Sequence, residues 1–212
     1  MTRRPASPGI ARFRLGGLLL LLAVTYFIGE VWAASGWEGR PYNWGVDAIS
    51  ELGVPEVREW AGQTVHSTLH AVMNATFVGT GIRVLLAGVV LAPFAPRRAR
   101  RTVLTLVALY GIGLLIVGFY PAGAGARGAM HGIGALLAIG GGSALLVALT
   151  VALWHRAPRL AWVTAALAAV SVAGVVCAVV GIGGFGLLER LAVDPVVLWQ
   201  IIAGVAVLTR RR

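Results

Sequence analysis

The stretch that decides the fold is residues 66–92, which reads HSTLHAVMNATFVGTGIRVLLAGVVLA. Its polar opening, with two histidines, runs into an apolar segment as long as the roughly 20 residues that a membrane-spanning helix needs. Residues four apart share a helix face, so His66, His70 and Asn74 would line one side. Ionisable groups at membrane depth are costly and usually mark a functional site. The stretch therefore predicts a spanning helix with a polar site at its outer end.

The composition of the chain is that of a polytopic membrane protein. Of its 212 residues, 58% are hydrophobic and 12% charged, whereas soluble domains are about half apolar and about a quarter charged. All 18 basic residues are arginines in short clusters between apolar runs, which indicates membrane orientation and argues against nucleic-acid binding. The lysine-free, arginine- and alanine-rich usage is typical of a GC-rich bacterial genome. The single cysteine, Cys177, is expected to be a small buried hydrophobe.

The apolar runs predict an all-α fold with one membrane domain over residues 14–212, preceded by a disordered cytoplasmic tail, residues 1–13. We expect six transmembrane helices, at about 14–34, 66–92, 102–120, 129–154, 160–182 and 194–209. The last run is short for a span, so it needs part of the preceding segment or a thinned bilayer. Arg83, inside the second helix, is expected to snorkel to the inner interface, with pairing to a carboxylate inside the bundle as the alternative.

Charge sets the expected topology. Of the 18 arginines, 13 lie in the tail, the two short basic loops and the C-terminus, while all eight acids fall on the other side. The positive-inside rule then places both termini in the cytoplasm and makes residues 35–65 an extracytoplasmic loop of a plasma-membrane protein. Within this loop, residues 46–52 are expected to form a short interfacial helix.

That topology brings chemically capable side chains to one outer level. Three histidines, His66, His70 and His131, are the candidate metal ligands at the starts of the second and fourth helices. The candidate catalytic groups of the loop are Asp47, Ser50 and Glu51, and the candidate ligand-binding groups are Asn74, Glu189 and Arg190. The membrane lipid is the expected partner, through an outward-facing polar pocket for a lipid headgroup or a small ligand.

Three alternatives stay open beside that pocket. Three protein ligands and a water are the pattern of catalytic zinc, which would activate the water for hydrolysis of a lipid ester or amide. The His-x-x-x-His spacing is weak evidence for zinc, because Ser67 stands where zincins have glutamate. A small transporter is another alternative. In the third alternative, the polar groups have a structural role only and hold the loop on the helix ends by hydrogen bonds. Whether the protein is an enzyme stays undecided.

Four pieces of the sequence form a joint pattern. They are Ile49-Ser50-Glu51-Leu52-Gly53, the stretch from His66 to Asn74, His131-Gly132-Ile133-Gly134-Ala135 and Gly186-Leu187-Leu188-Glu189-Arg190. Together they resemble a family of bacterial six-helix membrane proteins, catalogued as domain of unknown function 998, over roughly residues 14–209. The resemblance implies a compact six-helix bundle and assigns no activity.

Overall fold

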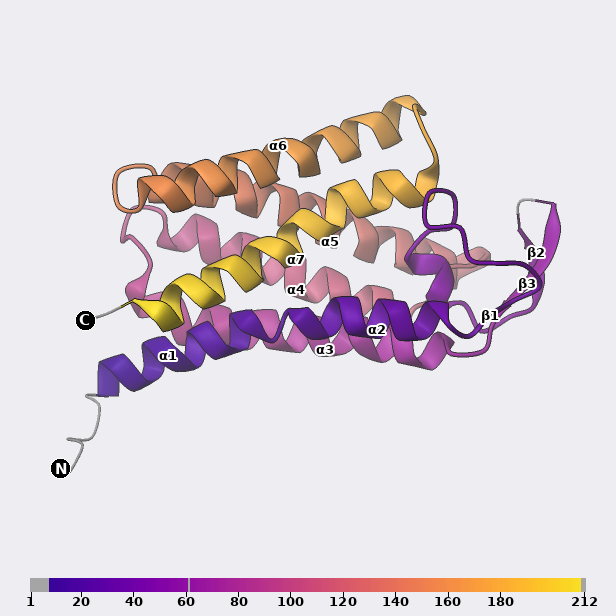
Figure 1. Cartoon of the computed structure of the whole chain (residues 1–212), viewed down its shortest axis with the longest axis horizontal. Helices are drawn as coiled ribbons and strands as arrows, with labels where there is room; N and C mark the ends of the chain where they lie inside the picture. Colours follow the sequence, from indigo (N-terminus) through magenta and orange to yellow (C-terminus); the bar gives the residue numbers. More distant parts are fainter. Residues whose placement is uncertain (1–7, 61, 211–212) are drawn as a thin grey trace.

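Six membrane-length helical segments make up most of the chain. A computed structural model describes residues 8–60 and 62–210. Within them, the segments long and apolar enough to cross a bilayer are Gly9–Ala34, His70–Phe94, Arg100–Phe119, Gly125–Leu153, Pro158–Val180 and Phe185–Thr209. They lie side by side in an elongated bundle (Figure 1). The predicted all-α, six-helix membrane fold is confirmed, because each segment reaches the roughly 20 residues that a span needs.

The first span is interrupted. It consists of α1 (Pro8–Leu21) and α2 (Val24–Ala34). At the break, the backbone N–H of Ala23 bonds back three residues, and the guanidinium of Arg83 donates to the carbonyl of Leu19 at 2.8 Å. Arg83 is therefore buried in the bundle rather than snorkelling to an interface. The tail prediction is also shortened, since α1 begins at Pro8; the predicted disorder of residues 1–7 lies outside the described residues.

The remaining spans form a closed ring. The second span is α3 (His70–Leu91) with the short 3-10 turn Ala92–Phe94, followed by α4 (Arg100–Phe119), α5 (Gly125–Leu153) and α6 (Pro158–Val180). Each helix packs against the next in sequence, and α7 (Phe185–Thr209) closes the ring on α1. Glycines allow the closest contacts: a Cβ at Gly113 of α4 would lie 2.7 Å from the carbonyl oxygen of Gly134 of α5.

The last helix is longer than the sequence suggested. Residues 194–209 were expected to form it alone, but α7 is one helix of 25 residues with Pro195 inside it. Proline has no N–H, so it leaves one carbonyl of the preceding turn without its helical donor. A neighbouring carbonyl, that of Ala192, accepts a hydrogen bond from Ser171 at 2.7 Å. The extra turns before Pro195 supply the length that the predicted span lacked.

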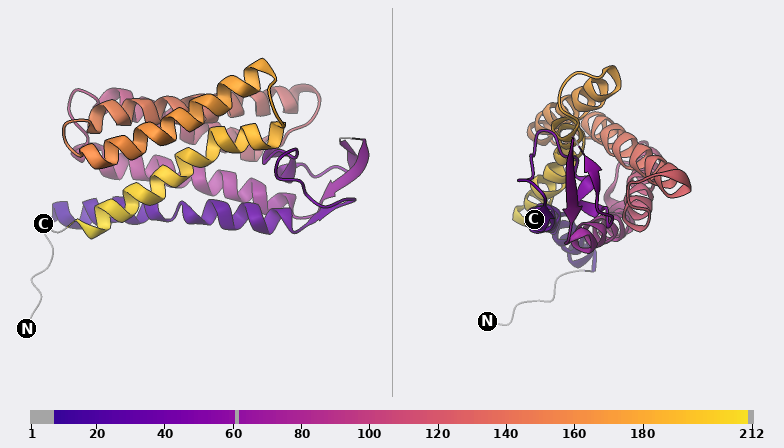
Figure 2. Two further views of the ribbon diagram at one scale, coloured as in Figure 1. Left: turned by 45° about the horizontal axis from the view of Figure 1, so that its top comes forward. Right: turned by 90° about the vertical axis from the view of Figure 1, so that its right-hand side faces the viewer.

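The segment between α2 and α3, residues 35–69, forms a cap that we call the lid (Figure 2). It holds β1 (Trp37–Glu38), the 3-10 turn Ser50–Gly53, β2 (Arg58–Trp60) and β3 (Gln63–Ser67) in an antiparallel sheet of order β1-β3-β2. The predicted second span is confirmed, but it begins at His70 instead of His66, and the short helix predicted at 46–52 is reduced to the 3-10 turn Ser50–Gly53. Thr64 and Val65 are β-branched, which suits a strand, and α3 starts only at His70.

The lid belongs to the core of the molecule. Ile49, Leu52 and Val65 are each at most 1% exposed and join the same apolar cluster as Met73 and Phe77 of α3. At the opposite end lie the start of α1, the α3–α4 and α5–α6 connections and the end of α7 (Figure 1). We call it the arginine-rich end, after its described arginines Arg12, Arg14, Arg97, Arg98, Arg100, Arg101, Arg156, Arg159 and Arg210.

Candidate functional site

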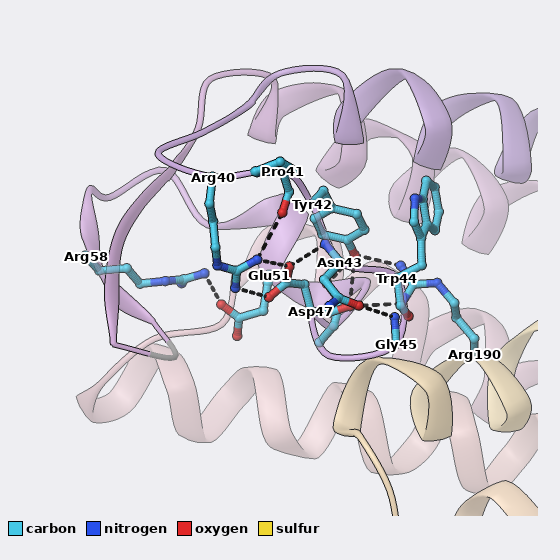
Figure 3. A network of polar contacts seen from close by, with 11 residues as sticks. Arg40, Pro41, Tyr42, Asn43, Trp44, Gly45, Asp47, Glu51, Arg58 and Arg190 are labelled. Atoms are coloured by element: carbon cyan, nitrogen blue, oxygen red, sulfur yellow. Dashed lines mark hydrogen bonds and ion pairs between the residues drawn. The ribbon is translucent and has the colours of Figure 1, made fainter.

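The candidate acids of the lid are ion-paired. Asp47, 0% exposed, accepts two hydrogen bonds from Arg40, at 2.6 and 2.5 Å, and one from the Asn43 N–H at 2.7 Å. Glu51 pairs with Arg58 of β2. The Asp47 hydrogen bonds raise the pKa of Arg40, and burial lowers that of Arg58. Figure 3 shows both pairs side by side in the lid. These acids are thus held by cations within the lid itself.

Arg190 fastens the lid to the bundle. Its Nε and Nη2 donate to Glu30 of α2 at 3.0 and 2.8 Å, and Nη2 also donates to the Tyr42 hydroxyl at 2.6 Å. Its Nη1 donates to the carbonyls of Trp44, Asp47 and Gly186, at 2.8, 2.9 and 3.0 Å (Figure 3). Burial raises the pKa of Tyr42, which keeps its hydroxyl protonated. Every nitrogen of the guanidinium is therefore engaged in holding α2, α7 and the lid together.

Glu189, the neighbouring residue on α7, caps the 3-10 turn of the lid. Its Oε2 accepts the N–H of Ile49 at 2.5 Å and that of Ser50 at 3.5 Å. A carboxylate at the start of a helical turn satisfies free N–H groups and complements their partial positive charge. Ser50, the predicted catalytic serine, is thereby buried at this cap.

At the other end of the same 3-10 turn, the free carbonyl groups accept hydrogen bonds from residues at and just before the start of α3. Asn74 donates its Nδ2 to the carbonyl of Gly53 at 2.8 Å, and Ser67 donates its hydroxyl to that of Leu52 at 2.7 Å. Three of the four sequence pieces that carry the family resemblance therefore meet here: the turn itself, the start of α3 and Glu189 with Arg190. These three pieces of sequence therefore share one structural role, which is to hold the 3-10 turn of the lid against α3 and α7.

The three histidines do not assemble into a metal site. His66, on β3, lies with Nδ1 3.9 Å from the exposed Glu38 carboxylate. The Nδ1 atoms of His70 and His131 lie 2.9 Å from the carbonyls of Ser67 and Tyr120, respectively. Across residues 8–60 and 62–210, no group of three or more His, Cys, Asp or Glu is placed to hold a metal ion. The predicted shared helix face is wrong, because His66 is in a strand.

A cavity lies at the arginine-rich end. It has a volume of about 1120 Å³, and apolar side chains of α1 and of α3 to α7 line most of it. Arg156, Arg159 and Arg210 line its exposed mouth, and none of them takes part in an ion pair among the described residues. Deeper inside, Gln200 donates to the Tyr110 hydroxyl at 3.4 Å. Sequence reasoning used these arginines only for topology and missed the cavity.

Comparison with known proteins agrees with this architecture. A family model described as "Protein of unknown function (DUF998)" matches residues 20–206, which covers the lid, the four middle spans and most of the first and last spans. No curated protein and no solved structure matches the chain. With six membrane-length helices and a family match over most of its length, this chain belongs to the DUF998 family of multi-pass membrane proteins.

Proposed function

We propose that this protein binds an anionic amphiphile, a lipid with a phosphate or carboxylate headgroup, in the cavity at the arginine-rich end. One observation carries the proposal: the walls are apolar, while the mouth holds three arginines that form no ion pair with any residue the structure describes. An unpaired guanidinium attracts an anion, and an apolar slot within a membrane attracts an acyl chain. A membrane lipid with a negative headgroup combines both chemistries in one molecule.

The dimensions of the cavity suit an acyl chain. Its lining on α7 runs from Val196 to Arg210, which is about 21 Å along the helix axis at the α-helical rise. That is more than half of the roughly 30 Å hydrocarbon core of a bilayer. The volume of about 1120 Å³ also exceeds the range of about 300–1,000 Å³ that is usual for small-molecule pockets. An extended chain would end near Tyr110 and Gln200.

The mouth suits a phosphate or carboxylate. Arginine offers a planar fork of N–H donors that matches the oxygens of either anion. Arg156 and Arg159 flank Pro158, where α6 begins, so the positive end of that helix adds to their charge. Arg210 reaches the same mouth from the end of α7. Three cations from two helix ends therefore favour one anionic headgroup.

Lipid binding was expected at the other end of the bundle. There, Asp47, Glu51 and Arg190 bond to partners of the lid and the helices, so they favour a closed cap. Among the described residues no group of three or more His, Cys, Asp or Glu is placed to hold a metal ion, so we prefer lipid binding to a zinc hydrolase. The expected ligand is therefore still a lipid, but its headgroup is expected at Arg156, Arg159 and Arg210 instead of at the lid end.

For orientation, we propose that the arginine-rich end faces the cytoplasm at the plasma membrane. The one-sided distribution of arginine supports this orientation through the positive-inside rule. A reporter that is active only in the cytoplasm, fused after Arg212, is expected to be active. Activity of a periplasmic reporter at that position would reverse the orientation.

The binding proposal is tested by titrating the purified full-length protein with phosphatidylglycerol and, separately, with phosphatidylcholine, followed by native mass spectrometry. Phosphatidylglycerol is expected to bind in preference. The Arg156→Gln/Arg159→Gln variant is expected to lose about tenfold or more in affinity, since each charge-assisted hydrogen bond contributes about 1.5–3 kcal/mol. Inorganic phosphate at the same concentration is expected not to displace the lipid, because it lacks the chain.

The matched control is Arg97→Gln/Arg98→Gln, which removes two arginines at the same end that do not line the cavity. Ala206→Trp narrows the cavity at an exposed lining position and is expected to weaken binding of both lipids. Equal affinities for the two lipids, or equal losses in the cavity and control variants, would overturn the proposal.

A further inference from the structure

Inside the lid end of the bundle, three carboxylates surround one cation. Glu30 of α2 accepts two hydrogen bonds from Arg190, and Glu189 caps the lid turn. Asp194 is the third, one helical turn after Arg190 and about 14 Å along α7 from its first residue. Its Oδ1 is buried and has no hydrogen-bond partner in the described part of the chain.

Arg190 is not free to neutralise Asp194. The two residues interact electrostatically, but all three guanidinium nitrogens donate to Glu30, Tyr42 or backbone carbonyls. Asp194 also feels the negative charges of Glu30 and Glu189. An ionised carboxylate at membrane depth without a donor is costly, and the group avoids that cost by taking up a proton.

The hydroxyl of Tyr26 is a second buried polar group without a hydrogen-bond partner among the described residues, and it interacts with the same carboxylates. Tyr26 lies on α2 and is 0% exposed. It interacts electrostatically with Glu30, Glu189 and Asp194, and with Tyr110 of α4. Two buried polar groups that lack hydrogen-bond partners and interact electrostatically are the arrangement expected where a proton, or a water that shares one, satisfies them.

We propose that Asp194 is a proton-binding site, and that its carboxyl carries a proton while the lid is closed. The groups that interact with it electrostatically are Tyr26 and Glu30 of α2, Tyr110 of α4, and Glu189 and Arg190 of α7. In the described residues, α5 and α6 add no charged group that interacts with it. Within residues 8–60 and 62–210, no group of three or more His, Cys, Asp or Glu, and so not these three carboxylates, is placed to hold a metal ion.

Release of this proton acts on the lid. The reaction converts the Asp194 carboxyl into a carboxylate and hands the proton to water. The new charge repels Glu30 and Glu189, the two carboxylates that carry the contacts of the lid with Arg190 and with Ile49. Proton binding therefore favours the closed lid, and this holds whatever occupies the cavity at the arginine-rich end.

The test uses a favourable property of the sequence: Asp47 and Asp194 are its only aspartates. Infrared spectra of the full-length protein in lipid nanodiscs, with and without ¹³C-carboxyl aspartate, distinguish a protonated aspartate from the glutamates. We expect a protonated-carboxyl band at neutral pH that moves with the label. Asp47 holds two hydrogen bonds from Arg40 and is expected to contribute only to the carboxylate bands.

Asp194→Asn is expected to abolish the band, and Glu56→Gln, at an exposed position of the lid, to keep it. If Asp194→Asn does not fold, the shift of the band on labelling the wild-type protein still shows whether an aspartate is protonated. Absence of a label-sensitive protonated band at neutral pH would refute the proposal, as would a band that survives Asp194→Asn or is lost only in Glu30→Gln.

Discussion

The two ends of this bundle use their charges in opposite ways. At the lid end, Asp47, Glu51 and Glu30 each have an arginine partner, and Arg190 joins the lid to both α2 and α7. At the arginine-rich end, Arg156, Arg159 and Arg210 surround a cavity and take part in no ion pair among the described residues. The lid end therefore pairs these three acids with arginines, while Asp194 at the same end has an oxygen without a hydrogen-bond partner among the described residues. Charged groups without partners, rather than charged groups as such, indicate where a ligand is expected.

The largest effect is expected at Arg190. Arg190→Met leaves Glu30 as an uncompensated buried charge, and loss of one partner from such a pair costs about 3–5 kcal/mol. Unfolding of the purified protein in mixed micelles, followed through reaction of the single thiol of Cys177, measures the loss. Adding Glu30→Gln is expected to recover part of it, because the orphan charge is removed. A loss below about 1 kcal/mol would mean that Arg190 does not fasten the lid.

A smaller effect is expected at Glu189. Glu189→Gln keeps the shape of the cap but removes its charge, and losing an N-terminal cap interaction costs about 1 kcal/mol. Hydrogen exchange at the Ile49 amide is expected to quicken, while the amides of the β2–β3 hairpin keep their rates. Unchanged exchange at Ile49 would contradict the capping role.

The ion pair between Glu56 and Arg127 tests the surface of the lid end. The hydrogen bond from Arg127 lowers the pKa of Glu56, so the pair stabilises the fold above the unfolded pKa of about 4.3 and loses this contribution as pH falls through the lower folded value. Both side chains are exposed, so the contribution is about 0.5 kcal/mol or less. Thermal unfolding of Glu56→Gln at pH 7 and pH 3 is expected to differ less than that of the wild type. An identical pH dependence in the two proteins would show that the pair contributes nothing.

The smallest effect on stability is expected at the cavity. Arg156→Gln/Arg159→Gln removes two cations that stabilise no carboxylate, so the free energy of unfolding should change by less than about 0.5 kcal/mol. The same unfolding assay measures it, with Arg97→Gln/Arg98→Gln as reference. If this variant lost as much free energy of unfolding as Arg190→Met, the charges at the two ends would contribute equally to stability, contrary to the comparison above.

Local patterns predicted the six helices, because hydropathy over about 20 residues depends on the segment alone. The lid strands, the ion pair of Arg190 and the cavity depend instead on contacts between residues far apart in sequence. His66 fell in a strand because its neighbours pair with β1 and β2, and helical spacing around it carries no trace of that pairing. Arg190 and Glu30 lie 160 residues apart in sequence, so their partnership follows only from the closure of α7 on the first span. The cavity is a space between helices, and no single segment encodes it.

One consequence follows from the position of Pro195. On its N-terminal side, α7 carries the two residues that hold the lid, and on its C-terminal side the same helix forms a wall of the cavity. A proline inside a helix is where bending is easiest. Pro195 lies between the part of α7 that holds the lid and the part that lines the cavity, so a bend at this residue would change the angle between the two.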